Sequence, residues 1–392
     1  MTQKSKKDRA ILTLIALSIS AFGIGSTEFI SVGLLPLIKS AFAVSLNQAG
    51  LTVSIYALGV TIGAPLMTAL TSHLNKKTIL LLVMTIFIIG NLVASIAPLF
   101  SILLFGRLIA SFAHGVFMSV ASVIAAEVVA PNKRASAIAF MFTGLTLATV
   151  TGVPLGTFIG QITNWRMSFV FIVGIGIIGL IANYFLVPKD LSKSKRISLK
   201  DIGQVLSSGQ MLIILLVTAI GYGGTFVVYT YITAILEDYL HFSPHTIVIL
   251  LVIYGLFVAI GNTIGGKLAN KNPLKTVFVS FICLSISLFF VYIFIFNQWL
   301  EVIAILTMGL FMFMSVPGLQ LYAVQIAERY LPHTTLMASA LNISAFNIGI
   351  FVGSLFGGEI VHFQGLNYTP IYGSLMVMLA IFVIGTWIAR KK

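Results

Sequence analysis

Charged residues are scarce in this sequence. They make up 8% of its 392 residues, whereas 58% are hydrophobic, and a typical soluble domain carries about 25% charged residues. A water-soluble protein of this size needs a far more polar surface. The composition therefore excludes a soluble globular protein and indicates that lipid covers much of the molecule.

The sequence also lacks the residue patterns of common catalytic and metal sites. Cys283 is its only cysteine and lies in an apolar run, which excludes a disulfide framework and a cysteine metal site. The patterns HExxH, GxSxG and DxDxDG are absent, and Leu268 follows the glycine-rich segment 261–267 where a nucleotide-binding loop requires Ser or Thr. We therefore expect no enzymatic activity, no metal and no organic cofactor.

Acidic residues are few, with 10 against 23 basic residues and a net charge of +13. The basic residues stand in short clusters between apolar runs, which is the pattern of the positive-inside rule and not of a nucleic-acid-binding surface. With both termini in the cytoplasm, every Lys and Arg except Lys39, Arg107 and Arg166 falls in a cytoplasmic segment. We expect a multi-pass protein of the inner (cytoplasmic) membrane in that orientation.

Hydrophobic runs of about 20 residues recur along the whole chain, which is the length a helix needs to cross ~30 Å of hydrocarbon. Backbone hydrogen bonds must close within each span, so the runs predict helices. The first run continues from the basic N-terminus to about Leu37 without a small-residue cleavage site, which predicts an uncleaved span. We predict an all-α membrane protein with twelve spans, at residues 11–37, 47–70, 78–97, 101–125, 135–161, 167–187, 209–235, 244–268, 274–297, 300–323, 335–362 and 368–389.

The two halves of the chain align at a single offset of 198 residues. Gly25 and Thr27 align with Gly223 and Thr225, and the match continues without gaps for more than fifty residues. Such internal repeats are typical of secondary transporters, in which one half moves against the other, although some channels contain repeats as well. The repeat predicts two pseudo-symmetric six-helix bundles.

The longest polar stretch, 188–208, lies between spans six and seven and contains a cluster of Lys and Arg. A polar stretch at this position is typical of a cytoplasmic linker. We therefore predict an N-terminal six-helix bundle at 1–187, a cytoplasmic linker at 188–208 and a C-terminal six-helix bundle at 209–392.

Glycines recur every four residues in spans five and eleven. Small residues at this spacing form a smooth helix face that allows backbones to approach closely. Plain helix packing and a role in sliding between states both remain open for these glycines, which are Gly152, Gly156 and Gly160, and Gly349, Gly353 and Gly357.

Two ionisable residues lie clearly inside apolar runs, where charges are costly and usually face a cavity. At ~1.5 Å per residue, Glu28 lies about 26 Å from the cytoplasmic end of span one. Span four runs inward, so Arg107 lies about 9 Å below the outer surface of the membrane. Both therefore have similar depth in the outer half of the membrane. His114, seven residues after Arg107, lies on roughly the same helix face. We expect these residues to face each other or a shared water-filled cavity.

The repeat places these groups in one half only, because Glu28 aligns with Phe226 and Arg107 with Ile305. Our hypothesis is that Glu28, Arg107 and His114 handle protons. Burial disfavours a charged carboxylate and a nearby arginine favours it, so substrate arrival can move the balance and release a proton. A purely structural Glu28–Arg107 ion pair and a packing role for His114 remain open.

Polar and aromatic residues at mid-membrane depth are the candidate substrate contacts, and in the C-terminal half they would form an aromatic, apolar wall. Several of them can instead pack against helices or lipid. The set comprises Tyr56, Tyr222, Phe226, Tyr229, Asn342 and Phe346. Glu127, at the end of span four, is expected to be solvated or paired with Lys133 or Arg134.

Two segments carry motifs similar to those of a known transporter family. The loop at 68–77, between spans two and three, ends in the basic pair Lys76 and Lys77, and span four contains Arg107 within 104–115. These segments resemble the glycine-aspartate-basic signature and the arginine motif of the major facilitator superfamily. In the first of them, Thr, Ser and Asn replace the usual Gly, Asp and Gly.

Span five favours one branch of this superfamily. Its segment 144–156 resembles the antiporter motif, with a valine between the glycine and the proline that are usually adjacent. The resemblance is to bacterial drug:proton antiporters, including arabinose-efflux-type and multidrug exporters, and it covers essentially the whole chain. It implies the major facilitator fold, with spans 1, 4, 7 and 10 around a central cavity, and proton coupling through the arginine motif. It also implies gating or conformational roles for Lys76, Lys77, Gly152, Pro154 and Gly156.

These features together predict a secondary active transporter. We expect proton-coupled efflux antiport of small amphipathic or drug-like molecules by alternating access, in a monomer that uses the proton gradient and no cofactor. Its partners would be the substrate, protons and the lipid bilayer, with no nucleic acid. A proton-coupled uptake symporter of a small metabolite and a facilitative pore remain as alternatives.

Overall fold

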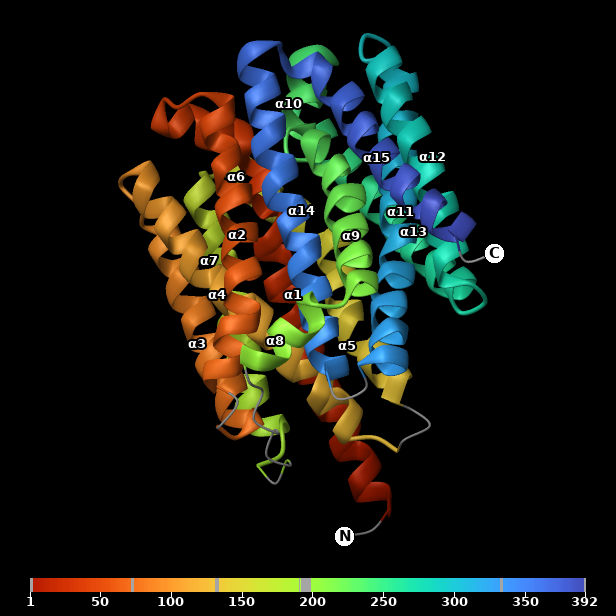
Figure 1. The fold of residues 1–392 in the computed structure, drawn as a ribbon. Helices are drawn as coiled ribbons and strands as arrows, with labels where there is room; N and C mark the ends of the chain where they lie inside the picture. The colour runs from red at the N-terminus through yellow and green to blue at the C-terminus, as the bar shows by residue number, and fades with distance from the viewer. Residues whose placement is uncertain are drawn as a thin grey trace.

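Long helices make up nearly all of the computed structural model, which describes residues 3–71, 74–130, 134–189, 191, 199–331 and 334–390 (Figure 1). Apolar residues dominate each long helix, and short polar loops join them. The helices are α1 (Gln3–Phe42), α2 (Leu46–Thr71), α3 (Lys76–Ser95), α4 (Phe100–Glu127), α5 (Arg134–Leu147), η2 (Ala148–Gly152), α6 (Val153–Ile162), α7 (Trp165–Leu186), α8 (Leu199–Leu206), α9 (Gly209–Tyr229), α10 (Ile232–Ala234), η3 (Ile235–Tyr239), α11 (Pro244–Ala269), α12 (Pro273–Phe294), α13 (Gln298–Tyr330), α14 (Thr335–Phe363), η5 (Leu366–Tyr368) and α15 (Thr369–Arg390).

In the described parts of the chain, twelve helical segments are long and apolar enough to cross a membrane. Each coincides with one predicted span, so the predicted all-α, twelve-span fold is confirmed. The largest differences are at helix ends. For example, α13 continues to Tyr330, seven residues beyond the predicted end at 323. The added turns contain Glu328 and Arg329. Charged residues fit this position because a helix can continue into water after its apolar segment leaves the lipid.

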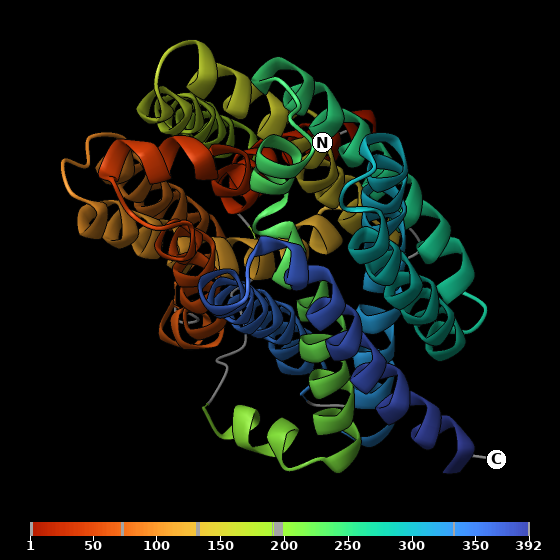
Figure 2. The same cartoon turned by 90° about the horizontal axis from the view of Figure 1, so that it is seen from above.

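The long helices form two bundles that lie side by side (Figures 1 and 2). In one bundle α1 packs against α5 and α7, and in the other α9 packs against α14 and α15. The bundles meet where α2 packs against α14 and where α11 packs against η2 and α6. The boundaries at 187 and 209 stay a prediction, and residues 190 and 192–198 of the expected linker lie outside the described residues.

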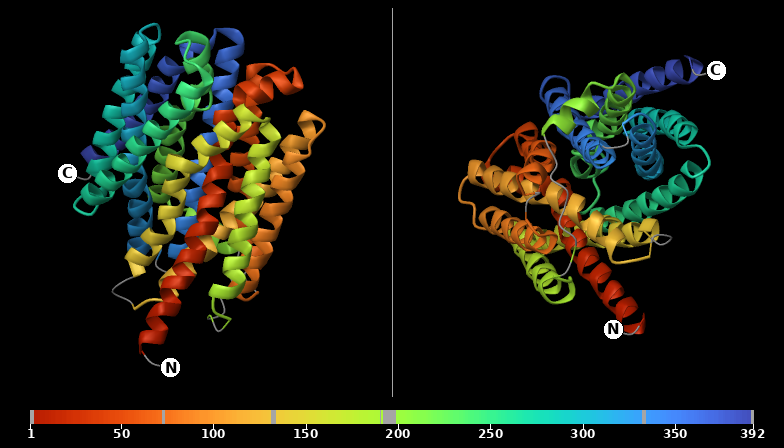
Figure 3. Two further views of the ribbon diagram at one scale, coloured as in Figure 1. Left: turned by 180° about the vertical axis from the view of Figure 1, so that it is seen from behind. Right: turned by 60° about the horizontal axis from the view of Figure 1, so that its bottom comes forward.

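The two ends of the bundles differ in charge. We call the end at which α1 begins (Figure 3) the basic end, because Arg9 near the start of α1 shares a pocket there with Lys77 and Lys189. The other end is the opposite end. At the basic end Lys76 forms an ion pair with Glu127. The ion pair joins the start of α3 to the end of the neighbouring antiparallel α4. The expected pairing of Glu127 with Lys133 or Arg134 stays a prediction, because Lys133 and the side chain of Arg134 lie outside what the structure describes.

The glycine faces of spans five and eleven hold each bundle together. Gly152, Gly156 and Gly160 face Ser26, Ile30 and Leu34 of α1. In the other bundle the equivalent glycines face α9, and here the backbones themselves touch. A Cβ at Gly357 would lie 2.5 Å from the carbonyl oxygen of Val227, and a Cβ at Gly353 would lie 3.0 Å from the carbonyl carbon of Gly223. The expected close packing is confirmed, and a sliding role stays a prediction.

Replacing Gly353 by alanine should therefore destabilise the protein more than replacing Gly156 by alanine. At Gly353 the added methyl group would collide with the α9 backbone, which cannot yield, whereas at Gly156 it would meet only the terminal methyl group of Ile30. Overpacking a tight contact costs about 1–3 kcal/mol. Thermal unfolding of the two variants in the same detergent checks this order, and an equal loss would contradict it.

Span five contains an irregular turn between α5 and α6. The π-helical turn η2 ends at Gly152, and Pro154 is the second residue of α6. Proline has no N–H to donate, so a wider turn before it avoids a strained helical hydrogen bond. Gly255 of α11 lies against the η2 backbone, where a Cβ would lie 2.6 Å from Cα of Val150. The predicted gating residues of span five thus lie beside a contact between the two bundles.

Candidate functional site

Arg107 lies at the centre of the N-terminal bundle and is completely buried. Its Nε donates to the carbonyl oxygen of Thr52 at 3.1 Å, Nη1 to that of Thr27 at 2.5 Å and Nη2 to that of Glu28 at 3.3 Å. One planar guanidinium thus joins α1, α2 and α4, which is the geometry that arginine, unlike lysine, provides. Further along the same pair of helices, α4 approaches Gly63 of α2 so closely that a Cβ there would lie 2.9 Å from Cα of Phe112.

Glu28 lies beside Arg107, as the sequence predicted, but through its main chain. The described residues show no direct ion pair and no hydrogen bond to the carboxylate, which is 9% exposed. A structural Glu28–Arg107 ion pair is therefore absent from this state. The carboxylate still lies within electrostatic range of Arg107, Tyr222 and Tyr229. It is thus positioned between a fixed cation of one bundle and aromatic hydroxyl groups of the other.

Tyr56 connects Arg107 and His114. The guanidinium carbon of Arg107 lies 4.2 Å from the centre of the Tyr56 ring, and the His114 ring lies 5.9 Å from it. The predicted common face of Arg107 and His114 is confirmed by this shared neighbour. Tyr56 is 1% exposed and serves as a cation–π partner of the arginine. Its contact with substrate stays a prediction.

The predicted aromatic residues of the C-terminal half form one continuous cluster. Tyr222 lies 5.4 Å from Phe226 and 4.9 Å from Phe346, and Phe226 lies 5.5 Å from Tyr229. Phe29, directly after Glu28, stacks on Phe226 at 6.4 Å and meets Tyr229 edge-on at 6.2 Å. The cluster therefore extends across the interface and reaches the residue next to the buried acid.

Several buried polar atoms of the membrane-spanning helices have no hydrogen-bond partner within the described protein. Such atoms are costly unless something satisfies them, so they indicate positions where a bound molecule or water can donate or accept. They come from both bundles, and two of them, Tyr56 and Tyr254, are equivalent in the repeat. The set comprises Ser31 Oγ, Tyr56 Oη, His114 Nδ1, Thr225 Oγ1, Tyr254 Oη, Ser344 Oγ and Asn347 Oδ1.

Asn342 has a different environment from the other predicted contacts. Its Oδ1 accepts from Thr218 at 2.9 Å, and its Nδ2 donates to Gln320 at 2.8 Å. Gln320 in turn donates to Ser339 Oγ at 2.7 Å. The structure thus assigns the Asn342 amide to a network that joins α9, α13 and α14, and its contact with substrate stays a prediction.

The predicted gating lysines lie at the basic end, away from the central cluster. Lys77 Nζ donates to the carbonyl oxygens of Tyr184 and Val187, at 2.6 Å each. It therefore caps the last turn of α7, where unpaired carbonyls attract a cation. Lys76 pairs with Glu127. Lys76 therefore joins α3 to α4, and Lys77 joins α3 to α7.

Two hydrogen bonds join the bundles in the half of the molecule toward the opposite end, and the sequence analysis did not identify them. Ser54 Oγ of α2 lies 2.6 Å from Ser354 Oγ of α14. Thr233 of α10 donates to the carbonyl oxygen of Val32 at 2.7 Å. A single sequence reveals no pairing between residues 300 positions apart, so no local signal could have found the first contact. We call these four residues the opposite-end seam.

A disulfide across this seam should stop transport reversibly. In a Cys283→Ser background, Ser54→Cys with Ser354→Cys places two thiols where the hydroxyl oxygens lie 2.6 Å apart, within disulfide reach. We expect oxidation to reduce transport to background and a reductant to restore it, because the bundles could no longer separate at this end. Each single-cysteine variant is the control. Wild-type transport by fully cross-linked protein would contradict a moving seam.

Glu301 is a buried acid that the sequence analysis did not select, because it lies at the edge of the predicted tenth span. It is completely buried, and neither carboxylate oxygen has a hydrogen-bond partner in the described residues. It lies in the first turn of α13, where the positive end of the helix dipole favours an acidic side chain. The opposite end therefore holds a second buried carboxyl group, separate from the site around Glu28.

Comparisons with known proteins agree with this architecture. The model of the Major Facilitator Superfamily matches residues 17–335 and 214–392. "Uncharacterized MFS-type transporter YtbD" of Bacillus subtilis is 50% identical over 98% of this chain and 97% of its own. "Inner membrane transport protein YdhP" of Escherichia coli is 38% identical over 95% of this chain and 94% of its own. A "Probable sugar efflux transporter" of Helicobacter pylori is 28% identical over 97% of this chain and 96% of its own. A crystal structure of a D-xylose-proton symporter matches with a TM-score of 0.77 at 15% identity, covering 95% of this chain and 97% of that one.

Proposed function

Because this chain belongs to the Major Facilitator Superfamily and is a multi-pass membrane transporter, we propose that it exports small amphipathic or drug-like molecules in exchange for protons. Transport occurs by alternating access between the two bundles, in a monomer that needs no cofactor beyond the proton gradient. The protein resides in the inner membrane with its basic end in the cytoplasm, as the distribution of Lys and Arg favours. The export direction is also favoured by the sugar efflux name of the Helicobacter relative.

The observation that carries this proposal is the position of the Glu28 carboxylate. It is buried between the bundles and accepts no hydrogen bond within the described residues, while the neighbouring Arg107 is engaged by three backbone carbonyls. A carboxylate in this position can take up a proton or face a polar group of the substrate, but it cannot do both at once. Competition of this kind is the elementary requirement of an antiporter.

The surroundings of Glu28 fit an amphipathic substrate. Rings of Phe29, Phe226 and Tyr229 offer apolar and π surfaces. Tyr254, whose ring stacks on Tyr229, has an unpaired buried hydroxyl group that can form a hydrogen bond. Large aromatic side chains with a few convergent polar atoms are the usual lining of small-molecule sites. The contacts of substrate with the predicted residues Tyr56, Tyr222, Phe346 and Asn342 belong to this proposal.

A sugar is a second candidate substrate. The unpaired hydroxyl groups of Tyr56 and Tyr254 favour it, because a polyhydroxylated molecule could bond to them while an aromatic ring stacks against its apolar face. The name of the Helicobacter relative points the same way. Both substrate classes use the same exchange at Glu28, so transport assays with one member of each class separate them.

Proton movement in liposomes tests the proposal directly. Purified protein is reconstituted around a pH-sensitive dye, and ethidium or arabinose is added outside as the amphipathic or the sugar probe. Antiport makes the lumen more alkaline as the probe enters, whereas symport makes it more acidic. A pore changes neither the pH nor the rate of uptake when the same probe is preloaded inside. Lumen acidification coupled to probe entry would overturn the proposal, and protein-free liposomes are the control.

A further inference from the structure

A pocket at the basic end lies apart from the central site. It encloses about 720 Å³ between the beginning of α1, the beginning of α3 and the end of α7 with the residues that follow. Of its nine lining residues, Arg9, Lys77 and Lys189 are positively charged and none is acidic. The charge of Lys77 interacts unfavourably with those of Lys189 and Arg9, so the three cations share one region.

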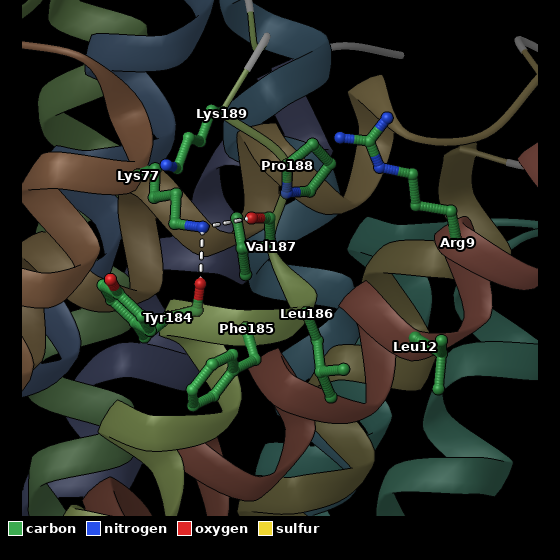
Figure 4. A pocket seen from close by; sticks show the side chains of 9 residues that line it. All are labelled: Arg9, Leu12, Lys77, Tyr184, Phe185, Leu186, Val187, Pro188 and Lys189. Atoms are coloured by element: carbon green, nitrogen blue, oxygen red, sulfur yellow. Dashed lines mark hydrogen bonds between the residues drawn. The ribbon is translucent and has the colours of Figure 1, made fainter.

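Hydrogen bonds hold one of the three cations of the pocket, Lys77, in place. Lys77 is fixed by its hydrogen bonds to the carbonyl oxygens of Tyr184 and Val187, and it retains one further N–H. Figure 4 shows the Lys189 side chain extending toward Lys77 on one side of Pro188, and Arg9 of α1 on the other side. The like charges of Lys77 and Lys189 repel each other, and a bound anion would reduce that repulsion, so the arrangement is suited to a phosphate group.

The rim of the pocket is apolar and exposed. Phe185 is 74% exposed, Tyr184 55% and Leu12 45%, and all three line the pocket at the ends of membrane-spanning helices. Aromatic residues at such ends lie at the level of the lipid headgroups. A molecule that fits both the cationic interior and the apolar rim has an anionic phosphate beside aliphatic chains. A soluble phosphate would fit only the interior.

We propose that this pocket binds the headgroup of an anionic phospholipid. The phosphate lies between Arg9, Lys77 and Lys189, and the acyl chains run along Leu12 and Phe185. Basic pockets between spanning helices are suited to such headgroups because each Lys or Arg attracts the anionic surface. The lipid would bridge α1, α3 and α7 of the N-terminal bundle at the basic end.

Native mass spectrometry of the purified protein tests this site with defined lipids. Wild-type protein in neutral detergent is titrated with phosphatidylglycerol and, separately, with phosphatidylcholine. The test variant is Arg9→Gln with Lys189→Gln, which leaves the Lys77 cap intact. The matched control is Lys267→Gln with Lys271→Gln, which removes two exposed charges at the end of α11, outside the pocket. Thermal unfolding verifies that all proteins are folded.

We expect wild-type protein to prefer phosphatidylglycerol, and the test variant to bind it more weakly by roughly fivefold for each charge removed. The control should match wild type, and phosphatidylcholine binding should not change. Equal weakening in test and control variants would overturn the proposal, since it would indicate a diffuse charge effect. Full displacement of the lipid by millimolar inorganic phosphate would also overturn it, since the ligand would then be the free anion.

Discussion

Replacing Glu28 by glutamine should abolish proton-driven transport while leaving the protein folded and able to bind substrate. Glutamine has nearly the same shape but cannot exchange a proton, and the Glu28 carboxylate has no hydrogen-bond partner in the described residues whose loss would unfold the site. In liposomes with an imposed pH gradient, accumulation should fall to the level of protein-free liposomes. Counterflow of substrate without a gradient should continue, because it requires movement of the bundles but no net proton transfer.

The pH dependence of binding gives a second measurement of the same variant. Proton and substrate compete for Glu28, so binding to the wild-type protein should weaken as the pH falls, and binding to Glu28→Gln should not depend on pH in that range. Glu301→Gln is the matched control, because Glu301 is also a buried acid without a hydrogen-bond partner, but in the first turn of α13. Undiminished gradient-driven transport by Glu28→Gln would remove Glu28 from the coupling mechanism.

Replacing Arg107 by lysine should cost both stability and transport although the charge remains. The ammonium group of lysine cannot reach the carbonyl oxygens of Thr27, Glu28 and Thr52 together, and it loses the planar stacking on Tyr56. Side-chain hydrogen bonds within membrane proteins contribute about 0.6–1.7 kcal/mol each, so the three bonds amount to about 2–5 kcal/mol. We expect a clear decrease in thermal stability and at least about a tenfold decrease in transport.

Arg166→Lys is the control for this prediction. Arg166 also stacks on an aromatic ring, with its guanidinium carbon 4.4 Å from the centre of Trp165, and donates to the carbonyl oxygen of Ala97 at 2.8 Å. It is half-exposed at the opposite end and joins fewer elements, so its replacement should change transport less than about twofold. Equal losses in the two variants would show that Arg107 has only a general packing role.

The sequence predicted the spans well because the membrane imposes one rule on every residue. A stretch that crosses hydrocarbon must be apolar and must close its backbone hydrogen bonds internally, and both requirements are visible over about twenty consecutive residues. Glu28 and Arg107 break this rule, and each can be recognised in the sequence as a charged residue within an apolar run. Their proximity followed from helix direction and depth, because both are fixed once the spans are numbered. The contact itself differs from the expected one, since Arg107 bonds the main chain of α1 and not the carboxylate.

Local sequence patterns could not predict the contacts between segments that are distant in the chain. Ser54 and Ser354 are ordinary small residues in apolar helices, and only the packing of α2 on α14 brings them together. The ion pair between Glu127 and Lys76 was missed for the same reason, because Lys76 is distant in sequence and adjacent only after α3 folds against α4. Glu301 was not selected because a position near the end of a span indicates water or protein equally well until the neighbouring helices are placed.

The sequence by itself determined that this protein is a twelve-span membrane protein of two repeated halves, with an acid and an arginine retained inside the lipid-crossing region of one half. Those properties depend on hydropathy and position along the chain, which are local quantities. Only the tertiary structure decided that Arg107 is held by three carbonyl oxygens of two neighbouring helices, that Phe29 beside Glu28 meets the aromatic rings of the other half, and that three cations line one pocket at the basic end. Those properties depend on which helices touch, and helix contacts in a membrane are selected by the shape of whole faces, which no single stretch of sequence contains.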